Sequence, residues 1–199
     1  MGKNKEKSDI PGQSRSVRRT KTALRNSLLE LMKIRPILRI SVKEICDAAD
    51  VGRSTFYAHY KDQYDLLREM EDEIFAYFTD MLKKYKDEHI KKETIQIFEE
   101  ILTYIANNNT AIQVILSENG DITFQKKLLY LFIMNKQIIK YFPKKEQDNE
   151  AMMYYFVFMI HGFNGLIHHW LKNNMAMPIP QMAGMMLKCI EQQFKFDLR

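Results

Sequence analysis

Apolar residues recur at spacings of three and four along almost the whole chain, which is the pattern of amphipathic helices. Leu24, Leu28 and Leu31 form one such stripe, and no stretch shows the alternation that a half-buried strand needs. The pattern predicts helices over residues 17–33, 42–49, 54–60, 61–86, 92–106, 110–116, 124–141, 149–171 and 179–194. Breaks fall between them, for example at Pro36 and Pro143. We therefore predict an all-α fold.

Two of the short helices are predicted to form a helix-turn-helix. Ser41 and Glu44 have the spacing of a capping box, in which the Ser hydroxyl accepts from the Glu amide and the Glu side chain reaches back. Residues 50–52 follow as a tight turn, where Gly52 can take a positive φ. Phe56 and Tyr60, four residues apart, face inward and leave polar side chains outside. A braced second helix with small hydrogen-bonding side chains at its start fits the major groove of DNA.

Composition narrows the class of protein. The chain has 199 residues, 46% of them hydrophobic, which is enough for a packed core. Two Cys are too few for a disulfide framework and fit a reducing cytoplasm, where we expect the protein to be. No apolar stretch follows the basic N-terminus, so no secretory signal is expected. Residues 151–171 lack Asp, Glu, Lys and Arg but include three His and one Asn, so we expect a buried helix and no membrane partner.

Charge is concentrated at the start of the chain. Residues 1–40 carry eleven Lys or Arg and three Asp or Glu, whereas the formal net charge of the whole chain is +5. A basic N-terminal part on a nearly neutral body is the electrostatic footprint of a polyanion binder. Residues 1–13 themselves are expected to be a disordered basic tail.

One motif carries a family resemblance. It reads Ile45-x-x-Ala48-Ala49-x-Val51-Gly52-x-Ser54-Thr55-Phe56-Tyr57-x-His59-Tyr60-Lys61-Asp62-x-x-Asp65-Leu66-Leu67. The motif, with the basic helix before it, resembles the DNA-binding domain of the TetR/AcrR transcriptional regulators over about residues 16–65. The resemblance implies a three-helix DNA-binding domain at residues 14–62 and a C-terminal helical bundle at residues 63–199 for dimerisation and ligand binding.

The same resemblance implies roles for individual residues. Ser41 would contact a backbone phosphate through its hydroxyl and the helix N-terminus. Arg53, Ser54 and Thr55 would approach base edges or nearby phosphates, with Arg53 and Ser54 setting sequence preference. The residues expected to grip the DNA backbone are Tyr57, His59 and Lys61.

One position departs from the family pattern, because Gln63 stands where a phosphate-contacting Lys is usual. Losing one phosphate contact weakens binding and reduces its salt dependence without abolishing it. The loss, together with acidic Asp62 and Asp65, leaves a second hypothesis open: a co-regulator that acts through protein–protein contacts and binds DNA weakly.

The C-terminal half carries a second resemblance. The stretches Asn109-x-x-x-x-x-x-Leu116-Ser117-x-Asn119-Gly120 and Phe163-x-x-Gly165-Leu166-Ile167-x-x-Trp170-Leu171-x-Asn173-x-Met175 resemble the C-terminal region of a low-GC Gram-positive branch of the family, which includes dihydroxyacetone-kinase operon regulators. The family's pattern implies a homodimer through the last two helices, 149–171 and 179–194. That dimer would bind a palindromic operator in double-stranded DNA as a repressor that a small ligand releases.

The resemblance also implies an effector pocket in the C-terminal bundle. The candidate lining residues are Tyr104, Phe132, Met134, Met159, Phe163 and His168, each of which has plain core packing as the alternative. A Met-rich lining would suit apolar or cationic small molecules.

His161, His168 and His169 share one helix face, and three His can bind zinc. The alternative, neutral His in a pocket or subunit interface, is favoured because no Cys or acidic residue lies within that segment. There is no Gly-rich phosphate loop and no nucleophile elbow either. We therefore expect no metal, no cofactor and no enzymatic activity.

Overall fold

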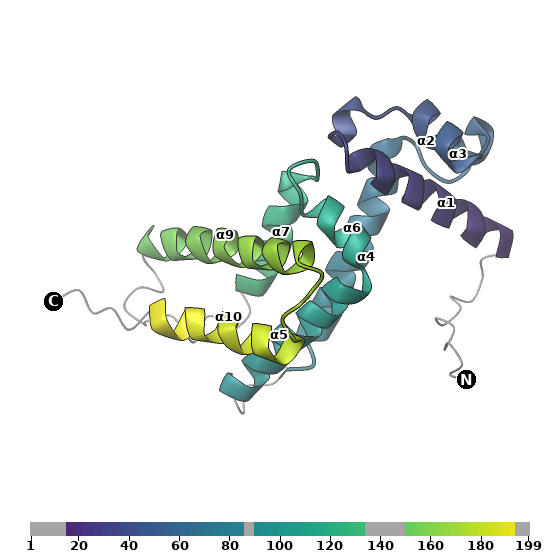
Figure 1. Cartoon of the computed structure of the whole chain (residues 1–199). Helices are drawn as coiled ribbons and strands as arrows, with labels where there is room; N and C mark the ends of the chain where they lie inside the picture. Colours follow the sequence, from purple (N-terminus) through teal and green to yellow (C-terminus); the bar gives the residue numbers. More distant parts are fainter. Residues whose placement is uncertain (1–14, 86–89, 134–149, 194–199) are drawn as a thin grey trace, which may run out of the picture. The chain divides into compact units, whose positions relative to one another are not determined.

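A computed structural model describes residues 15–85, 90–133 and 150–193, and every regular element in these ranges is helical (Figure 1). The chain divides into two compact units, the first ending at Leu67 and the second beginning at Arg68. The expected tail at residues 1–13 lies outside the described residues. No helix in the described ranges has the length and apolar character needed to cross a membrane.

The first unit is built on α1 (Arg15–Met32), α2 (Val42–Ala49) and α3 (Arg53–Tyr57), with a short 3₁₀ turn, η1 (Ile37–Arg39), before α2. α2 packs on α1, and α3 packs on α2 (Figure 1). The core of this unit is fully buried and apolar, with Leu24, Leu28, Ile45, Phe56 and Leu66 at its centre. α3 ends at Tyr57, three residues earlier than the sequence pattern predicts.

The start of α4 (Gln63–Leu82) belongs to the first unit. We expected the boundary after residue 62, whereas the structure includes the first turn of α4 through Leu67. Leu66 and Leu67 are both buried, so this turn contributes to a core rather than to a linker. A single helix therefore begins in the first unit and continues in the second.

The turn between α2 and α3 differs from the expectation in one backbone detail. Asp50, not Gly52, takes the left-handed conformation, with a φ of 52°. Asp tolerates this conformation better than most residues, and it ends α2 here. Gly52 has a φ of −64° and caps α3, so a positive φ does not explain its presence.

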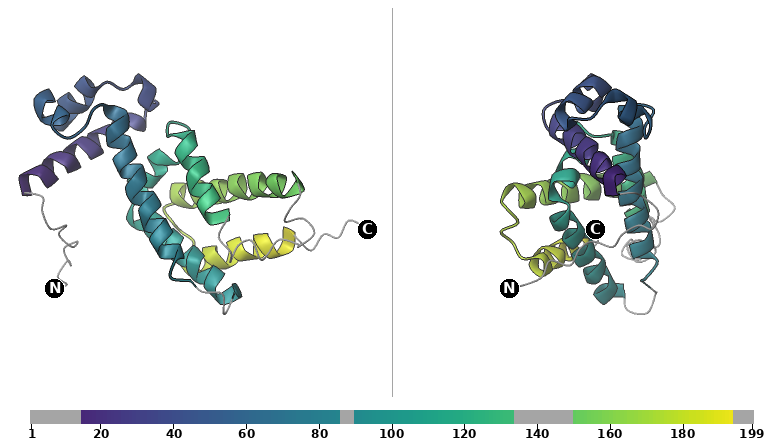
Figure 2. Two further views of the ribbon diagram at one scale, coloured as in Figure 1. Left: turned by 180° about the vertical axis from the view of Figure 1, so that it is seen from behind. Right: turned by 90° about the vertical axis from the view of Figure 1, so that its right-hand side faces the viewer.

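The second unit contains the rest of α4 together with α5 (Ile90–Asn107), α6 (Asn109–Ile115), α7 (Ile122–Ile133), α9 (Glu150–Lys172) and α10 (Ile179–Gln193). α10 lies against α5, and α9 contacts α6 (Figure 2). The buried residues at the centre include Ile97, Leu102, Met186 and Ile190. The α9–α10 connection is anchored by Trp170, whose indole Nε1 donates to the carbonyl of Met177 at 2.8 Å.

Candidate functional site

The start of α3 presents three polar side chains to solvent. Arg53, Ser54 and Thr55 are all exposed, as the sequence predicts for a reading helix. Phe56 anchors the helix from below, because its side chain is fully buried. Its ring lies 5.6 Å from the ring centroids of both Tyr57 and Tyr60. The buried aromatic side therefore holds the polar side outward.

The residues that follow α3 extend this surface. The Tyr57 side chain is 58% exposed, Lys61 is exposed, and His59 is half-buried with its ring against Tyr60. The backbone N–H of Lys61 donates to the Asp65 carboxylate at 3.1 Å, which fixes the chain just before α4. All three predicted backbone-gripping residues thus lie within five positions of one another on the first unit.

Asp62 and Asp65 have local structural roles. The Asp65 amide donates to the Asp62 carboxylate at 2.8 Å, so Asp62 caps the start of α4. The Asp65 carboxylate in turn accepts from Lys61, as above. Backbone capping explains both acidic residues without a protein partner, which removes one motive for the co-regulator hypothesis.

Ser41 forms the predicted capping box but with an additional bond. The Glu44 amide donates to the Ser41 hydroxyl at 3.3 Å, and the Ser41 amide donates to the Glu44 carboxylate at 2.9 Å. The hydroxyl itself donates to the same carboxylate oxygen at 2.7 Å. Arg35 bonds the other carboxylate oxygen at 2.5 Å. The hydroxyl proton that a phosphate would accept is therefore already engaged by Glu44.

This network stabilises the negative form of Glu44. Hydrogen bonds from the Ser41 hydroxyl and amide, with a further one from Arg35, lower the pKa of Glu44 to about 2. An ionised carboxylate thus occupies the N-terminus of α2, where the helix dipole favours an anion. The positive charge of Arg35 is paired with the same carboxylate.

The basic side chains on α1 had no individual contacts predicted for them. Arg15, Arg18 and Arg19 are exposed on its first turns. The Lys21 ammonium lies 5.2 Å from the centroid of the Tyr60 ring, which links α1 to the segment after α3. The excess of basic residues in positions 1–40 was the signal in the sequence that could have pointed to these arginines. It does not show which of these side chains face outward.

The second unit contains a partly open cavity of about 380 Å³. Each of α4, α5, α6, α7, α9 and α10 contributes residues to its walls, which are almost entirely apolar. Aromatic pairs brace the walls: Phe78 lies 5.1 Å from Phe132, and Phe98 lies 5.9 Å from Phe163, between ring centroids. An apolar cavity with a few polar groups is typical of a small-molecule site.

Three of the predicted pocket residues line this cavity, namely Phe132, Met159 and Phe163. Tyr104 does not, because its ring stacks on Tyr77 at a centroid distance of 4.1 Å. His168 is exposed on α9 and is also absent from the lining. Met134 lies outside the described residues.

Further polar residues at the cavity come from α7 and α9. Gln125, Lys126, Tyr130 and Asn164 were not predicted to line a pocket, whereas His161 was expected in a pocket or a subunit interface. Gln125 also has a structural task, because its side-chain amide donates to the carbonyls of Ile115 at 3.0 Å and Ser117 at 2.8 Å. Periodicity marks which residues share a helix face, but not which face borders a cavity.

The outer face of α9 is strongly apolar at its start. Tyr154 is 70% exposed and Phe158 is 65% exposed, whereas Val157, which is 49% exposed, also lines the cavity. Gly162 and Gly165 continue this face, and an added Cβ at either would meet no atom within 4 Å. Exposed aromatic surface of this extent on one helix is typical of a protein–protein interface.

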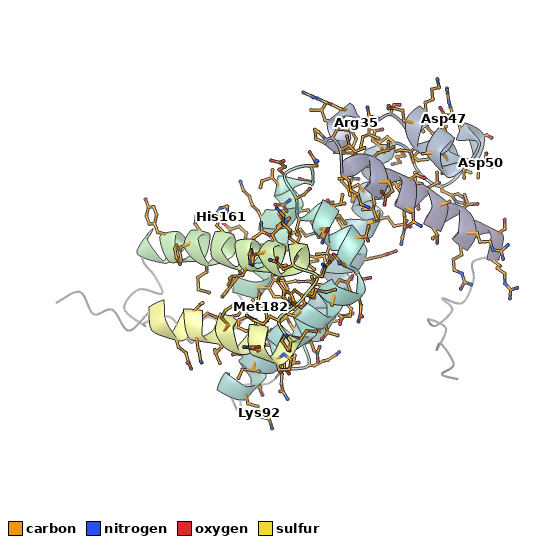
Figure 3. The ribbon with its side chains drawn as sticks, viewed as in Figure 1. Arg35, Asp47, Asp50, Lys92, His161 and Met182 are labelled. Carbon is orange, nitrogen blue, oxygen red and sulfur yellow. The ribbon has the colours of Figure 1, made fainter. Side chains whose placement is uncertain are left out.

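The three His of α9 are all exposed (Figure 3 labels His161). Among the residues described, no group of three or more His, Cys, Asp or Glu side chains is placed to hold a metal ion.

Comparison with known proteins agrees with this architecture. Residues 92–192 match the family model TetR_C_8, described as a transcriptional regulator C-terminal region. The matched range contains both stretches on which the second resemblance rests. No curated protein sequence matches the chain.

Several solved structures share the fold. A TetR transcriptional regulator from Streptococcus agalactiae 2603V is 22% identical, with a TM-score of 0.60 over 89% of this chain and 96% of that chain. A TetR-family regulator from Syntrophomonas wolfei is 16% identical, with a TM-score of 0.61 over 92% and 99% of the two chains. NalD from Pseudomonas aeruginosa, a secondary repressor of the MexAB-OprM multidrug efflux pump, is 15% identical, with a TM-score of 0.61 over 92% and 100%.

Proposed function

Because the chain belongs to the TetR family of transcriptional regulators, we propose that α3 of each subunit of a homodimer reads one half of a palindromic operator. The observation that carries the proposal is the exposed trio Arg53, Ser54 and Thr55 above the buried Phe56. In a helix-turn-helix, the first residues of the reading helix contact base edges in the major groove. Arg53 suits a guanine, because its guanidinium can donate twice to one base.

The positioning contacts come from the residues around α3. Tyr57 and Lys61 are exposed and can reach phosphates, and half-buried His59 can donate to one. Arg15, Arg18 and Arg19 of α1 add positive charge that the sequence analysis left unassigned. We assign Ser41 mainly to capping α2, because Glu44 already accepts its hydroxyl proton. The missing charge at Gln63 is then offset by arginines elsewhere on the unit.

The dimer is proposed to form through α9 and α10. Tyr154 and Phe158 expose large apolar surfaces on α9, and Gly162 and Gly165 leave room for a partner helix to approach closely. A two-fold axis would place the same face of both subunits in contact and match the symmetry of a palindrome.

Ligand control is proposed to act through the cavity of the second unit. Phe78 of α4 lines it, and α4 begins in the unit that carries α3. A ligand changes DNA affinity only if it binds two conformations of the protein unequally. We propose repression relieved by that ligand, since a dimer bound on a promoter blocks polymerase.

The test is binding of the full chain to a randomised duplex library by fluorescence anisotropy at two salt concentrations, followed by variants on the selected palindrome. Arg53→Ala is expected to weaken operator binding by about 1–3 kcal/mol and to relax preference at one base pair. Arg68→Ala removes the same charge from an exposed position in the second unit and is the matched control. Equal effects of the two variants, or no selected palindrome, would refute the assignment of α3.

A further inference from the structure

The buried residues that line the cavity offer an occupant only apolar side chains. They include Phe78 of α4, Ile101 and Ile105 of α5, Ile112 of α6 and Met186 of α10. Each of these helices contributes from its buried side, so an occupant loses water over most of its surface. Affinity there comes from burying apolar area, at roughly fourfold for each methylene group removed from water.

The described polar residues that line the cavity all belong to α7 and α9. Lys126 and Tyr130 stand four apart on α7, and His161 and Asn164 stand three apart on α9. Lys126, Tyr130 and His161 are exposed, and Asn164 is half-buried, so these side chains mark the solvent side of the cavity. The side-chain amide N–H groups of Gln125 already donate to two backbone carbonyls, so they are not available to a ligand.

We call Lys126, Tyr130, His161 and Asn164 the rim of the cavity, and its formal charge is positive only. Lys126 carries the only formal charge among the described lining residues, which include no Asp or Glu. A cationic ligand would therefore meet an ammonium and no carboxylate, contrary to what a Met-rich lining suggests. An anionic group at the rim could accept a hydrogen bond from Lys126 while remaining partly hydrated.

We infer that the effector cavity takes a single-chain amphipath, with a hydrocarbon chain in the apolar body and a carboxylate head at Lys126. The inference rests on the proposed function, since it names the ligand class of that regulator's cavity. The hydrocarbon chain supplies most of the affinity, and the rim sets the preference for an anionic head. The cavity volume of about 380 Å³ lies near the lower end of the range for small-molecule sites, which suits one chain rather than two.

The experiment is calorimetric titration of the full-length protein with three ligands that share one chain: decanoate, decanol and decyltrimethylammonium, all below their aggregation limits. Decanoate is expected to bind most tightly and the cation most weakly. Octanoate is expected to bind at least about tenfold more weakly than decanoate, because two fewer methylenes are buried.

Two variants test the rim. Lys126→Gln is expected to weaken decanoate binding roughly three- to tenfold and to leave decanol unchanged, because the partner charge is solvent-exposed. Lys126→Glu is expected to reverse the order of decanoate and decyltrimethylammonium. Lys127→Gln is the control, since Lys127 is the neighbour on α7 but lies over the Phe75 ring at 4.2 Å from its centroid and does not line the cavity.

The inference is overturned if decanol or the cation binds as tightly as decanoate, if Lys126→Gln changes nothing, or if none of the ligands binds. Operator binding by the same preparation, without any ligand, is measured in parallel. Operator binding without amphipath binding refutes this inference alone, whereas loss of both refutes the proposed function with it.

Discussion

Glu71 provides a quantitative test of how the second unit is packed. Its side chain is 6% exposed on α4, and its Oε1 atom has no hydrogen-bond partner among the described residues. Burial raises the pKa of Glu71 from 4.5 to about 7, and the negative charges of Asp121 and Asp72 add to the effect. Near pH 7 about half of the folded molecules therefore hold a carboxylate that would be more stable in water.

The pKa shift sets both the size and the pH window of the effect. A rise of the pKa from 4.5 to about 7 corresponds to about 3.4 kcal/mol as an upper bound, and screening by water reduces the expected effect to about 1.5–2 kcal/mol. Because the folded pKa is raised, the destabilisation is absent below pH 4.5, grows between pH 4.5 and 7, and is complete above pH 7. Glu71→Gln, which cannot ionise, should thus stabilise the protein above pH 7 and have little effect below pH 4.5.

The assay is urea denaturation followed by circular dichroism at pH 4.5, 6 and 8, at fixed protein concentration because the proposed dimer would contribute to stability. Asp80→Asn on the same helix is the control, since its ion pair with Lys83 is exposed and should matter by about 0.5 kcal/mol or less. A Glu71→Gln protein that is destabilised at pH 8, or equally affected at pH 4.5 and 8, would refute the reasoning.

Three further predictions address the turn before α7, the cap of α2 and the outer face of α9. Gly120→Ala should destabilise the second unit by more than about 3 kcal/mol in thermal unfolding, because an added Cβ would lie 2.0 Å from the Ile115 carbonyl oxygen; a near-normal melting temperature would contradict this packing. Ser41→Ala should reduce the free energy of unfolding by about 1 kcal/mol through loss of the cap, and an unchanged urea midpoint would show that the cap is dispensable. The free energy of unfolding of the wild-type protein should also fall as the pH is lowered from 4.5 toward the Glu44 pKa of about 2. Phe158→Glu should convert dimer to monomer in light scattering without loss of helicity, and a persistent dimer would place the interface elsewhere.

Local interactions explain why so much of the first unit was predictable. The Ser41–Glu44 capping box, the burial of Phe56 and Tyr60, and the exposure of Arg53, Ser54 and Thr55 all follow from spacings of three or four residues. Such spacings determine which side chains share a helix face, whatever the helix packs against. The helical periods of α5, α6 and α10 were predicted for the same reason.

Other features depended on atoms that the local pattern does not place. The left-handed residue in the turn after α2 is Asp50 rather than Gly52, because Asp50 is the C-cap residue at which α2 ends and the chain changes direction. The Ser41 hydroxyl donates to Glu44, so a residue correctly located in the motif has less capacity for the phosphate contact expected of it.

The cavity shows the same limit over longer distances. Tyr104 and Phe132 are both aromatic residues of predicted helices and were both expected to line the pocket. The ring of Tyr104 instead stacks on Tyr77, whereas Phe132 lines the cavity. Nothing in the sequence distinguishes Lys126 from its neighbour Lys127, yet Lys126 lines the cavity and Lys127 does not. The sequence by itself determined the helices and the polar face of α3, because both depend on neighbours within one or two turns. The tertiary structure alone decided the cavity, its one-sided charge and the strained burial of Glu71, because these depend on which helices meet across gaps of many residues.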